Sequence, residues 1–396
     1  MKLLLLSGVG VVYNSVVVRL GEYMVRRTHA RKFMVSRLIE SISRFLRRRG
    51  YRGYRVEYVE ERIIIDTDKA EAVARDLSLV PGISSTAPSL SIELDMKLLI
   101  DNLIKLLEET IQPNQSFSIR IHRGIQPIDS KGLEEYLGSI IHEYFGNPVN
   151  LVNPDLEIII EFRGDRIYLS NKVFKGIGGL PYGSEGCLVT LVSGGIDSAV
   201  ASWYAMKRGA EIIPVYINLY PYWSQKAVKR AYESIELIWK HVPWDYMKAY
   251  IVHGVGNIVA KARVPDRLRC LFCKANMYRI ASIISMENNC QGIVTGEAVG
   301  QVASQTLKNM YVTTTTCIQP IYRPLAFMDK IEINRLAHTL GFSKLDTSVG
   351  KCMLKPPYPQ TKASQRDLEI LLKALDETTS DIIELLEKAE IREYSV

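Results

Sequence analysis

Residues 193–198, Ser-Gly-Gly-Ile-Asp-Ser, have the composition of a loop that binds phosphate. They follow an apolar segment at residues 187–192 and precede an expected helix at residues 198–208. In such a strand–loop–helix unit, backbone amides and the positive end of the helix face a bound anion. The two glycines allow the backbone to approach the anion where a Cβ would clash. The lysine of the G-x-x-x-x-G-K-S/T loop is missing, so the sequence predicts a nucleotide site of another type.

Cysteine is the second residue type here that could do chemistry. Cys270 and Cys273 form a Cys-x-x-Cys pair just before an expected helix, and Cys352 stands in the stretch Gly-Lys-Cys-Met-Leu-Lys. The chain has six cysteines, too few and too scattered for the disulfide framework of a small secreted domain. The other three lie in or beside apolar stretches and are expected to be buried structural thiols: Cys187, Cys290 and Cys317.

The positive charge of the chain is concentrated near its N-terminus. The formal net charge is +7, yet the first 60 residues contain 13 Lys/Arg and 4 Asp/Glu. This pattern favours a nucleic acid as partner, with a solvated basic helix face as the alternative. No apolar run reaches the length of a membrane helix, and Gly8, Gly10, Tyr13 and Asn14 interrupt the apolar start. We therefore expect a buried strand at residues 2–6, no membrane partner and a cytoplasmic location.

The elements that would position these residues follow from the apolar pattern of an α/β protein. Residues 1–90 show the order strand, helix, two strands, helix, strand, which is ferredoxin-like. These elements are expected at residues 2–7, 30–49, 54–58, 62–66, 68–77 and after residue 82. A second α/β unit is expected from about residue 95 to 172, with helices at 95–110 and 130–145 and strands at 117–122, 156–162 and 166–170.

The C-terminal half has the pattern of a doubly wound parallel sheet. A Gly- and Pro-rich segment at residues 174–182 is expected to be a linker into it. Apolar strands then alternate with helices, and the strands are expected at residues 187–192, 211–217, 248–252 and 292–295. The charged tail after about residue 359 is expected to be helical.

The loop at residues 193–198 resembles the PP-loop of ATP pyrophosphatases, which adenylate a carbonyl oxygen and release pyrophosphate. Other stretches make the chain similar to the tRNA 4-thiouridine synthetases. They are GIGGLPYG at 176–183, TGEAVGQVASQTL at 295–307, RPLAFMDKIEI at 323–333 and Asn-Pro-Asp at 153–155, the last resembling the end of a THUMP domain. The resemblance extends from near residue 19 to about residue 362.

The resemblance implies three domains, an N-terminal ferredoxin-like domain at 1–80, a THUMP RNA-binding domain at 81–173 and a PP-loop catalytic domain at 174–396. The first two would bind the acceptor end of a tRNA, and the third would thiolate a uridine. It implies that ATP is held by Leu191, Val192, Ser193, Gly194, Gly195, Asp197, Ser198, Tyr216, Ile217, Lys274, Gly296 and Gln305. We expect Asp197 to be essential, either as a Mg²⁺ ligand or by ordering the loop.

The basic residues of the first two domains are the expected contacts to tRNA phosphates. Such contacts position RNA by its backbone and shape and do not read bases. The candidates are Arg26, Arg27, Arg31, Lys32, Arg37, Arg47, Arg48 and Arg49 in the first domain, and Arg120, His122 and Arg123 in the second.

The cysteines of the chain bear on the source of the sulfur. We find no segment like the rhodanese domain that supplies a persulfide in many bacterial members. A branch of the family without that domain carries the same Cys-x-x-Cys and third cysteine. That resemblance implies that Cys270, Cys273 and Cys352 hold a [4Fe–4S] cluster with one iron open to sulfide. Structural zinc with a fourth ligand and redox or persulfide cysteines are the alternatives.

Several alternatives and partners stay open at this level. PP-loop enzymes also activate small molecules for amination, but a small substrate needs no basic RNA-binding front end, and no glutaminase-like segment is found. A non-catalytic RNA-binding protein with a decayed loop conflicts with the intact Ser-Gly-Gly-x-Asp-Ser motif. The sequence leaves open whether sulfide or a donor protein supplies sulfur, and whether the chain forms a homodimer.

Overall fold

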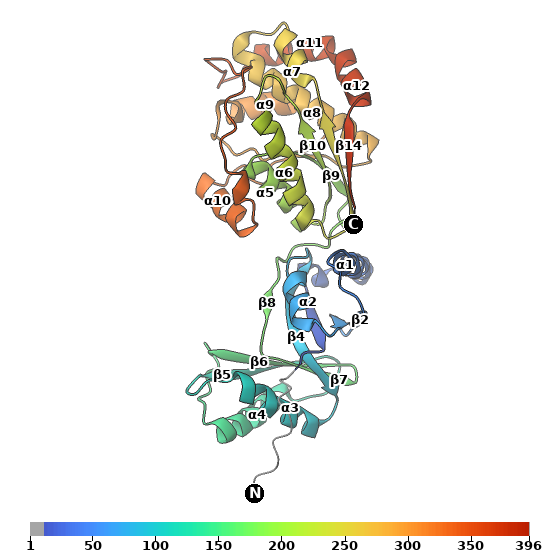
Figure 1. The fold of residues 1–396 in the computed structure, drawn as a ribbon, viewed down its shortest axis with the longest axis vertical. Coiled ribbons are helices and arrows are strands. Elements are labelled where there is room, and N and C mark those ends of the chain that lie inside the picture. The colour runs from blue at the N-terminus through green and yellow to red at the C-terminus, as the bar shows by residue number, and fades with distance from the viewer. Residues whose placement is uncertain (1–11, 396) are drawn as a thin grey trace. The chain divides into compact units, whose positions relative to one another are not determined.

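A computed structural model describes residues 12–395 of the chain (Figure 1). The chain forms two compact units, Met1–Pro181 and Tyr182–Val396. The strand expected at residues 2–7 lies outside the described residues. Within the described part, no helix is long and apolar enough to cross a membrane.

The first half of unit 1 has the ferredoxin-like order, beginning at β1 (Ser15–Leu20). This strand was missed in the sequence, although Val16, Val17 and Val18 are buried almost completely. The elements that follow are α1 (Thr28–Arg48), β2 (Arg55–Val59), β3 (Arg62–Asp66), α2 (Ala70–Leu77) and β4 (Ile83–Glu93). Val16 and Val18 alternate in β1 and pack with the apolar faces of α1 and α2, as a half-buried strand does.

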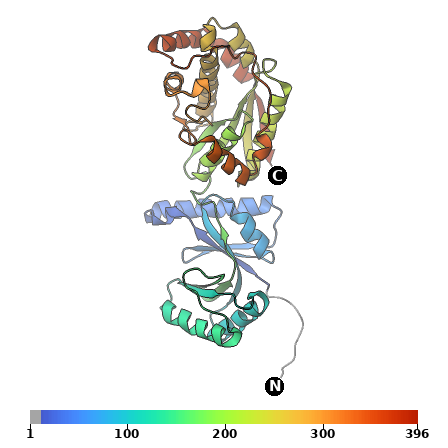
Figure 2. The ribbon, with the colours of Figure 1, turned by 90° about the vertical axis from the view of Figure 1, so that its left-hand side faces the viewer.

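The second half of unit 1 contains the two expected helices and three expected strands. They are α3 (Met96–Thr110), β5 (Phe117–Arg123), α4 (Ser130–Phe145), β6 (Leu156–Arg163) and β7 (Arg166–Ser170). Asp95 caps α3 and Asp129 caps α4, each by accepting a backbone N–H of the first turn. Both helices cover the same face of this part of the sheet, as the two views show (Figures 1 and 2). The expected linker starts with a two-residue strand, β8 (Phe174–Lys175).

One long strand joins the two halves of unit 1 into a single sheet with the order β2-β3-β1-β4-β7-β6-β5. β4 pairs with β1 through residues 83–89 and with β7 through residues 90–93. The halves are also linked by Glu161 of β6, which is 1% exposed and binds Arg19, Arg62 and Arg163. Burial raises the pKa of Glu161, but the three guanidiniums outweigh this and keep it below its ordinary value.

Unit 2 is the expected doubly wound domain, with the strand order β13-β12-β9-β10-β11-β14. Its sheet is parallel except for the last strand, β14. On one face α5 packs against α6 and α10, and on the other α8 packs against α7, α9 and α11. The strands are β9 (Cys187–Leu191), β10 (Glu211–Ile217), β11 (Tyr246–Val252), β12 (Ile293–Val294), β13 (Ile321–Tyr322) and β14 (Glu390–Ser395). The helices are α5 (Ile196–Lys207), α6 (Gln225–His241), α7 (Val255–Lys261), α8 (Arg269–Glu287), α9 (Leu307–Thr315), α10 (Lys330–Thr339), α11 (Gln365–Glu377) and α12 (Thr379–Glu387).

The structure corrects the expectation that Cys187 and Cys290 are free thiols, because a disulfide joins them. Cys187 begins β9, and Cys290 precedes β12, which is the parallel neighbour of β9. The neighbouring strand starts bring the two cysteines together, and Gln291 N donates to Cys187 O at 2.9 Å. Cys317, Cys270, Cys273 and Cys352 remain free thiols.

The tail after residue 359 is helical, as expected, only as far as α12. It ends in β14, which pairs antiparallel with β11 at the edge of the sheet. The sequence of β14, Glu-Ile-Arg-Glu-Tyr-Ser, has little apolar content and its residues are largely exposed. Pairing with the open edge of β11 supplies the backbone partners that this strand requires.

Candidate active site

The glycine loop connects β9 to α5 and is held in one conformation by its own side chains. Ser198 Oγ accepts from Ser193 N at 3.1 Å and donates to Gly195 O at 2.9 Å. Gly194 has φ +82°, and a Cβ there would lie 2.8 Å from Ala231 N of α6. The position therefore requires glycine for its backbone angle and for its close approach to α6. α5 begins at Ile196, two residues earlier than expected.

Asp197 lies in the first turn of α5 and contacts a residue that the sequence did not single out. Its Oδ1 is 2.6 Å from Lys330 Nζ, at the start of α10. Asp329 fixes this start with a capping box, in which it accepts from Glu332 N while the Glu332 side chain accepts from Asp329 N. The segment RPLAFMDKIEI at 323–333 thus brings a cation to the acid of the loop.

The segment after β12 packs directly on the loop. A Cβ on Gly296 would lie 2.6 Å from Asp197 C and 2.6 Å from Ser198 N, so glycine permits the contact. β12 and β10 are the parallel neighbours of β9, and their carboxyl ends meet at one edge of the sheet. Tyr216 and Ile217, at the end of β10, are both buried at this edge. Burial raises the pKa of Tyr216 to about 12, so its ring stays neutral.

Glu297 is the centre of a buried ion cluster at this site, and sequence reasoning missed it. Its carboxylate accepts from Lys274 Nζ at 2.5 Å, Tyr278 OH at 2.5 Å, Arg323 Nε at 2.7 Å and Thr295 Oγ1 at 3.2 Å. Burial raises its pKa, but Lys274 and then Arg323 lower it to about 2. An acid inside the apolar TGEAVG stretch was the available signal, since buried carboxylates require partners.

Two further nucleotide candidates adjoin this cluster. Lys274 Nζ also donates to Ser304 Oγ at 3.2 Å, and Gln305 follows in the chain. Among the described residues, Gln305 Oε1 is buried without a hydrogen-bond partner. Lys274 and Ser304, which precedes Gln305, thus join the Glu297 cluster, and Gly296, the neighbour of Glu297, packs on the glycine loop. That these residues bind a nucleotide stays a prediction.

The three candidate ligand cysteines lie on two segments of unit 2. Cys270 and Cys273 lie within the first two turns of α8 and not before the helix, so their three-residue spacing places them on one face. Cys352 lies in a loop tied to the start of α6, where Met353 N donates to Tyr222 O at 2.8 Å. Burial and then the nearby Cys352 raise the pKa of Cys270 and raise that of Cys273 to about 12. No group of three or more His, Cys, Asp or Glu in the described part of the chain is arranged as a metal site.

The basic candidates for RNA binding lie on two elements of unit 1. On and beside α1 are Arg26, Arg27, Arg31, Lys32, Arg37, Arg47, Arg48 and Arg49. Arg31 pairs with Glu61 at 3.3 Å, and Arg37 pairs with Glu40 at 2.9 Å. The second group, Arg120, His122 and Arg123, is on β5, the last strand of the sheet. Burial lowers the pKa of His122, so this residue is not a fixed cation near neutral pH.

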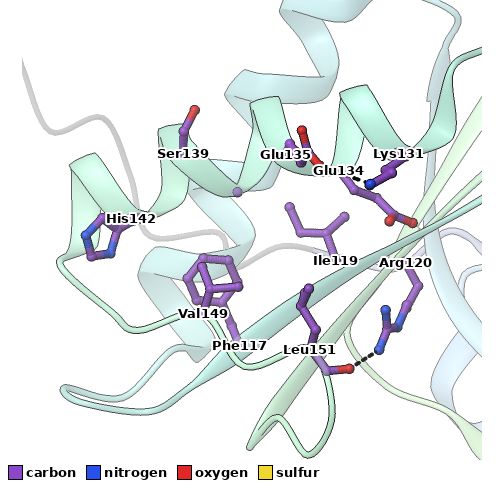
Figure 3. A pocket seen from close by; sticks show the side chains of 11 residues that line it. Phe117, Ile119, Arg120, Lys131, Glu134, Glu135, Ser139, His142, Val149 and Leu151 are labelled. Carbon is purple, nitrogen blue, oxygen red and sulfur yellow. Dashed lines mark hydrogen bonds and ion pairs between the residues drawn. The ribbon is translucent and has the colours of Figure 1, made fainter.

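A cavity of about 360 Å³ opens between α4 and β5 beside Arg120 (Figure 3). Phe117 and Ile119 form an apolar floor, and Leu151 closes one side. Arg120 donates to the Leu151 carbonyl and pairs with Glu157 at 3.3 Å, which holds the guanidinium at the rim. The cavity belongs to unit 1 and does not include any nucleotide candidate.

Comparisons with known proteins agree with this arrangement. A family model described as "Thiamine biosynthesis protein (ThiI)" matches residues 183–376, one for the ThiI ferredoxin-like domain matches 15–87, and one for the THUMP domain matches 94–172. A probable tRNA sulfurtransferase of Methanosarcina acetivorans is 35% identical over 90% of this chain and 88% of its own length. Another, of Methanobrevibacter smithii, is 32% identical over 95% of this chain and 98% of its own.

A solved structure gives the same picture at the level of the whole chain. A 4-thiouridine synthetase in complex with RNA and ATP matches with a TM-score of 0.85 and 25% identity, over 97% of this chain and 100% of that one. A protein of Pyrococcus horikoshii matches with a TM-score of 0.65 and 23% identity, over 83% of this chain and 99% of that one.

Proposed function

This chain belongs to the tRNA sulfurtransferase family, and we propose that it converts a uridine of tRNA to 4-thiouridine at the expense of ATP. The uracil C4 oxygen attacks the α-phosphorus of ATP, and pyrophosphate leaves. Hydrosulfide then adds to C4, and the C4–O bond breaks to release AMP. One ATP is consumed per sulfur, and no electrons change hands when sulfide is the donor. ATP-dependent thiolation of tRNA is the activity that the ferredoxin-like, THUMP and catalytic domains share with the relatives.

One observation carries the assignment of the catalytic centre. Two of the stretches that resemble the synthetases, residues 295–307 and 323–333, contact the glycine loop. Gly296 packs on the loop backbone, and Lys330 pairs with Asp197 at 2.6 Å. A phosphate-binding loop alone would not require these two distant segments.

The chain's own groups suit the adenylation step. α5 begins directly after Gly195, so the backbone amides of its first turn are in position to bind the phosphates of ATP. Asp197 is a suitable oxygen ligand for Mg²⁺, which usually takes one or two carboxylates together with substrate phosphates. When bound, Mg²⁺ neutralises charge on the departing pyrophosphate. Lys330 and Lys274 add positive charge to the same region.

We assign sulfur delivery to Cys270, Cys273 and Cys352, with a [4Fe–4S] cluster as the group that they hold. Three free, partly buried thiols support this donor set, and burial followed by the nearby Cys352 raises the pKa of Cys270 and of Cys273. These three cysteines would hold such a cluster, and the cluster would supply sulfide as the nucleophile. Zinc, or a persulfide on Cys352, is the alternative if iron does not bind.

The tRNA is held by unit 1 in this proposal, with residues 1–80 and 81–173 as its two RNA-binding domains and residues 174–396 as the catalytic domain. The basic groups on α1 and β5 provide phosphate contacts, so binding should weaken as the salt concentration rises. The reaction requires a source of reduced sulfur, which is either free sulfide or a donor protein.

The direct test uses the full chain, an unmodified tRNA transcript, ATP and sulfide under anaerobic conditions. We expect 4-thiouridine in the digested tRNA, with pyrophosphate released only when tRNA is present. Thiolation without ATP, or release of ADP in place of pyrophosphate, would refute the proposal.

A further inference from the structure

The carboxylate of Glu297 connects three segments that each lead to a different part of the catalytic centre. It is 5% exposed and accepts hydrogen bonds from α8 through Lys274 and from the segment after β13 through Arg323. Its neighbour Gly296 touches the backbone of the glycine loop. The same acid thus lies where the cysteine helix, the loop and the segment leading to Lys330 meet.

The position of Lys274 depends on this acid. Lys274 follows Cys273 on α8, and its side chain is only 16% exposed. An ammonium group has three donors, of which two are directed to Glu297 Oε1 at 2.5 Å and Ser304 Oγ at 3.2 Å. One donor therefore remains for a further acceptor, and Gly296, the neighbour of its partner Glu297, packs on the glycine loop.

The charges in the cluster support an anionic ligand at that position. Glu297 supplies one negative charge, whereas Lys274 and Arg323 supply two positive ones. Arg323 has two further partners. Its Nη2 donates to Thr314 Oγ1 at 2.8 Å, and its guanidinium lies over the ring of Tyr278. Lys274 is consequently the cation of the cluster that is able to turn to a phosphate.

We propose that Glu297 is a positioning residue that holds the Lys274 ammonium at the phosphates of ATP and fixes the cysteine helix α8 against the glycine loop. The proposal rests on the proposed function for its ligand. It explains a buried acid with four donors next to a loop that binds anions. A flexible lysine alone would lose side-chain entropy on binding phosphate, and the contact with Glu297 removes most of that freedom beforehand.

The test measures the dissociation constant of ATP for the full chain without tRNA, so that it does not depend on thiolation. Glu297→Gln keeps the shape of the side chain but removes its charge, and Lys274→Met removes the ammonium. Each substitution should weaken ATP binding about tenfold, because a hydrogen bond to a charged group contributes roughly one power of ten. The double variant should bind ATP no more than about twofold more weakly than Lys274→Met alone, because Glu297 acts through Lys274.

Glu161→Gln is the matched control. Glu161 is equally buried and is also surrounded by cations, but it lies in unit 1. Its variant should lower the unfolding temperature while leaving the ATP dissociation constant unchanged. Glu297→Asp keeps the charge and should recover at least half of the lost binding free energy, which makes a test available if Glu297→Gln folds poorly.

Wild-type affinity in Glu297→Gln, or losses that simply add in the double variant, would overturn the inference. If Glu297→Gln acted only by destabilising the fold, Glu161→Gln would weaken ATP binding as well. The loss of ATP binding in either variant would then add to the loss in Lys274→Met. If the wild-type chain binds ATP in this manner but releases no pyrophosphate with tRNA, the proposed function fails while the role of Glu297 stands.

Discussion

Lys330 Nζ lies 2.6 Å from Asp197 Oδ1, although the two residues are 133 positions apart in the chain. The contact joins the first turn of α5 to the first turn of α10 at the mouth of the glycine loop. It places a cation and an acid together where pyrophosphate would leave.

Lys330→Met should slow tRNA-dependent pyrophosphate release by about 100-fold or more, the usual effect of removing one group that stabilises developing charge. Asp197→Asn should be at least as harmful, because the loop acid is lost as well. Lys330→Arg keeps the charge and should be intermediate. The measurement is pyrophosphate release at saturating ATP. A wild-type rate in Lys330→Met would contradict the assigned role.

Gly296→Ala should weaken ATP binding and lower the unfolding temperature. The added Cβ would lie 2.6 Å from the backbone of Asp197 and Ser198, so the loop has to move. Gly138→Ala is the control, since Gly138 is in α4 and a methyl group added there would meet no heavy atom within 4 Å among the described residues, apart from its chain neighbours and the backbone of its own helix. That change should be neutral or stabilising by up to about 1 kcal/mol, because alanine favours a helix. Equal behaviour of the two variants would show that the contact at Gly296 is unimportant.

Cys352→Ala should abolish thiolation while leaving pyrophosphate release largely intact, because the cysteines act after adenylation. The anaerobically purified protein should contain iron and acid-labile sulfide, and both should decrease in this variant. Cys317→Ala is the control, because Cys317 contacts Ser282 and Gln319 and is outside the three-cysteine group. Stoichiometric zinc, or no metal after reconstitution, would exclude the cluster and leave a persulfide on Cys352.

The Glu297 cluster should make stability depend on acid pH. The folded pKa is lowered from 4.5 to about 2, so its stabilising effect is complete above pH 4.5 and is lost as the pH falls toward 2. The groups facing it are Lys274, Tyr278, Arg323 and Thr295. The free energy of unfolding should therefore fall more steeply from pH 4.5 to 2 in the wild type than in Glu297→Gln. Parallel curves would contradict the ion cluster.

The disulfide between Cys187 and Cys290 predicts a thiol count. The denatured, metal-free protein should titrate four thiols without reductant and six after reduction. Because 103 positions separate the two cysteines, the cross-link should stabilise the fold by about 4 to 5 kcal/mol on the chain-entropy estimate. Six thiols before reduction would show that the bond does not form.

Much of the fold follows from the local pattern of apolar residues. The elements that could not be predicted in this way are defined by contacts between residues distant in sequence. The glycine loop and the strands beside it can be predicted because apolar runs and glycines determine the conformation of their own short segments. β14 is polar and exposed, so only the open edge of β11 defines it. β1 was missed because the apolar run before it, at residues 2–7, was predicted to be the strand instead.

In the candidate site, too, some residues could be predicted from the sequence, and others are recognised only by their contacts. Asp197, Gly296 and Lys274 were predicted from the resemblance; Gly296 packs on Asp197, and Lys274 pairs with the next residue, Glu297. Glu297 acquires its meaning only from partners on α8 and after β13, and Lys330 only from Asp197. The disulfide likewise depends on β9 and β12 being neighbours, which no short stretch of sequence specifies.

The central claim is that the C4 oxygen of a uridine becomes bonded to the phosphorus of AMP. A tRNA carrying oxygen-18 at C4 of its uridines tests this directly, with ATP, sulfide and the full chain under anaerobic conditions. The account predicts that the released AMP gains one oxygen-18 atom for each 4-thiouridine formed, and that pyrophosphate gains none. Thiolated tRNA together with unlabelled AMP would contradict it, because the oxygen would then have left by a route other than adenylation.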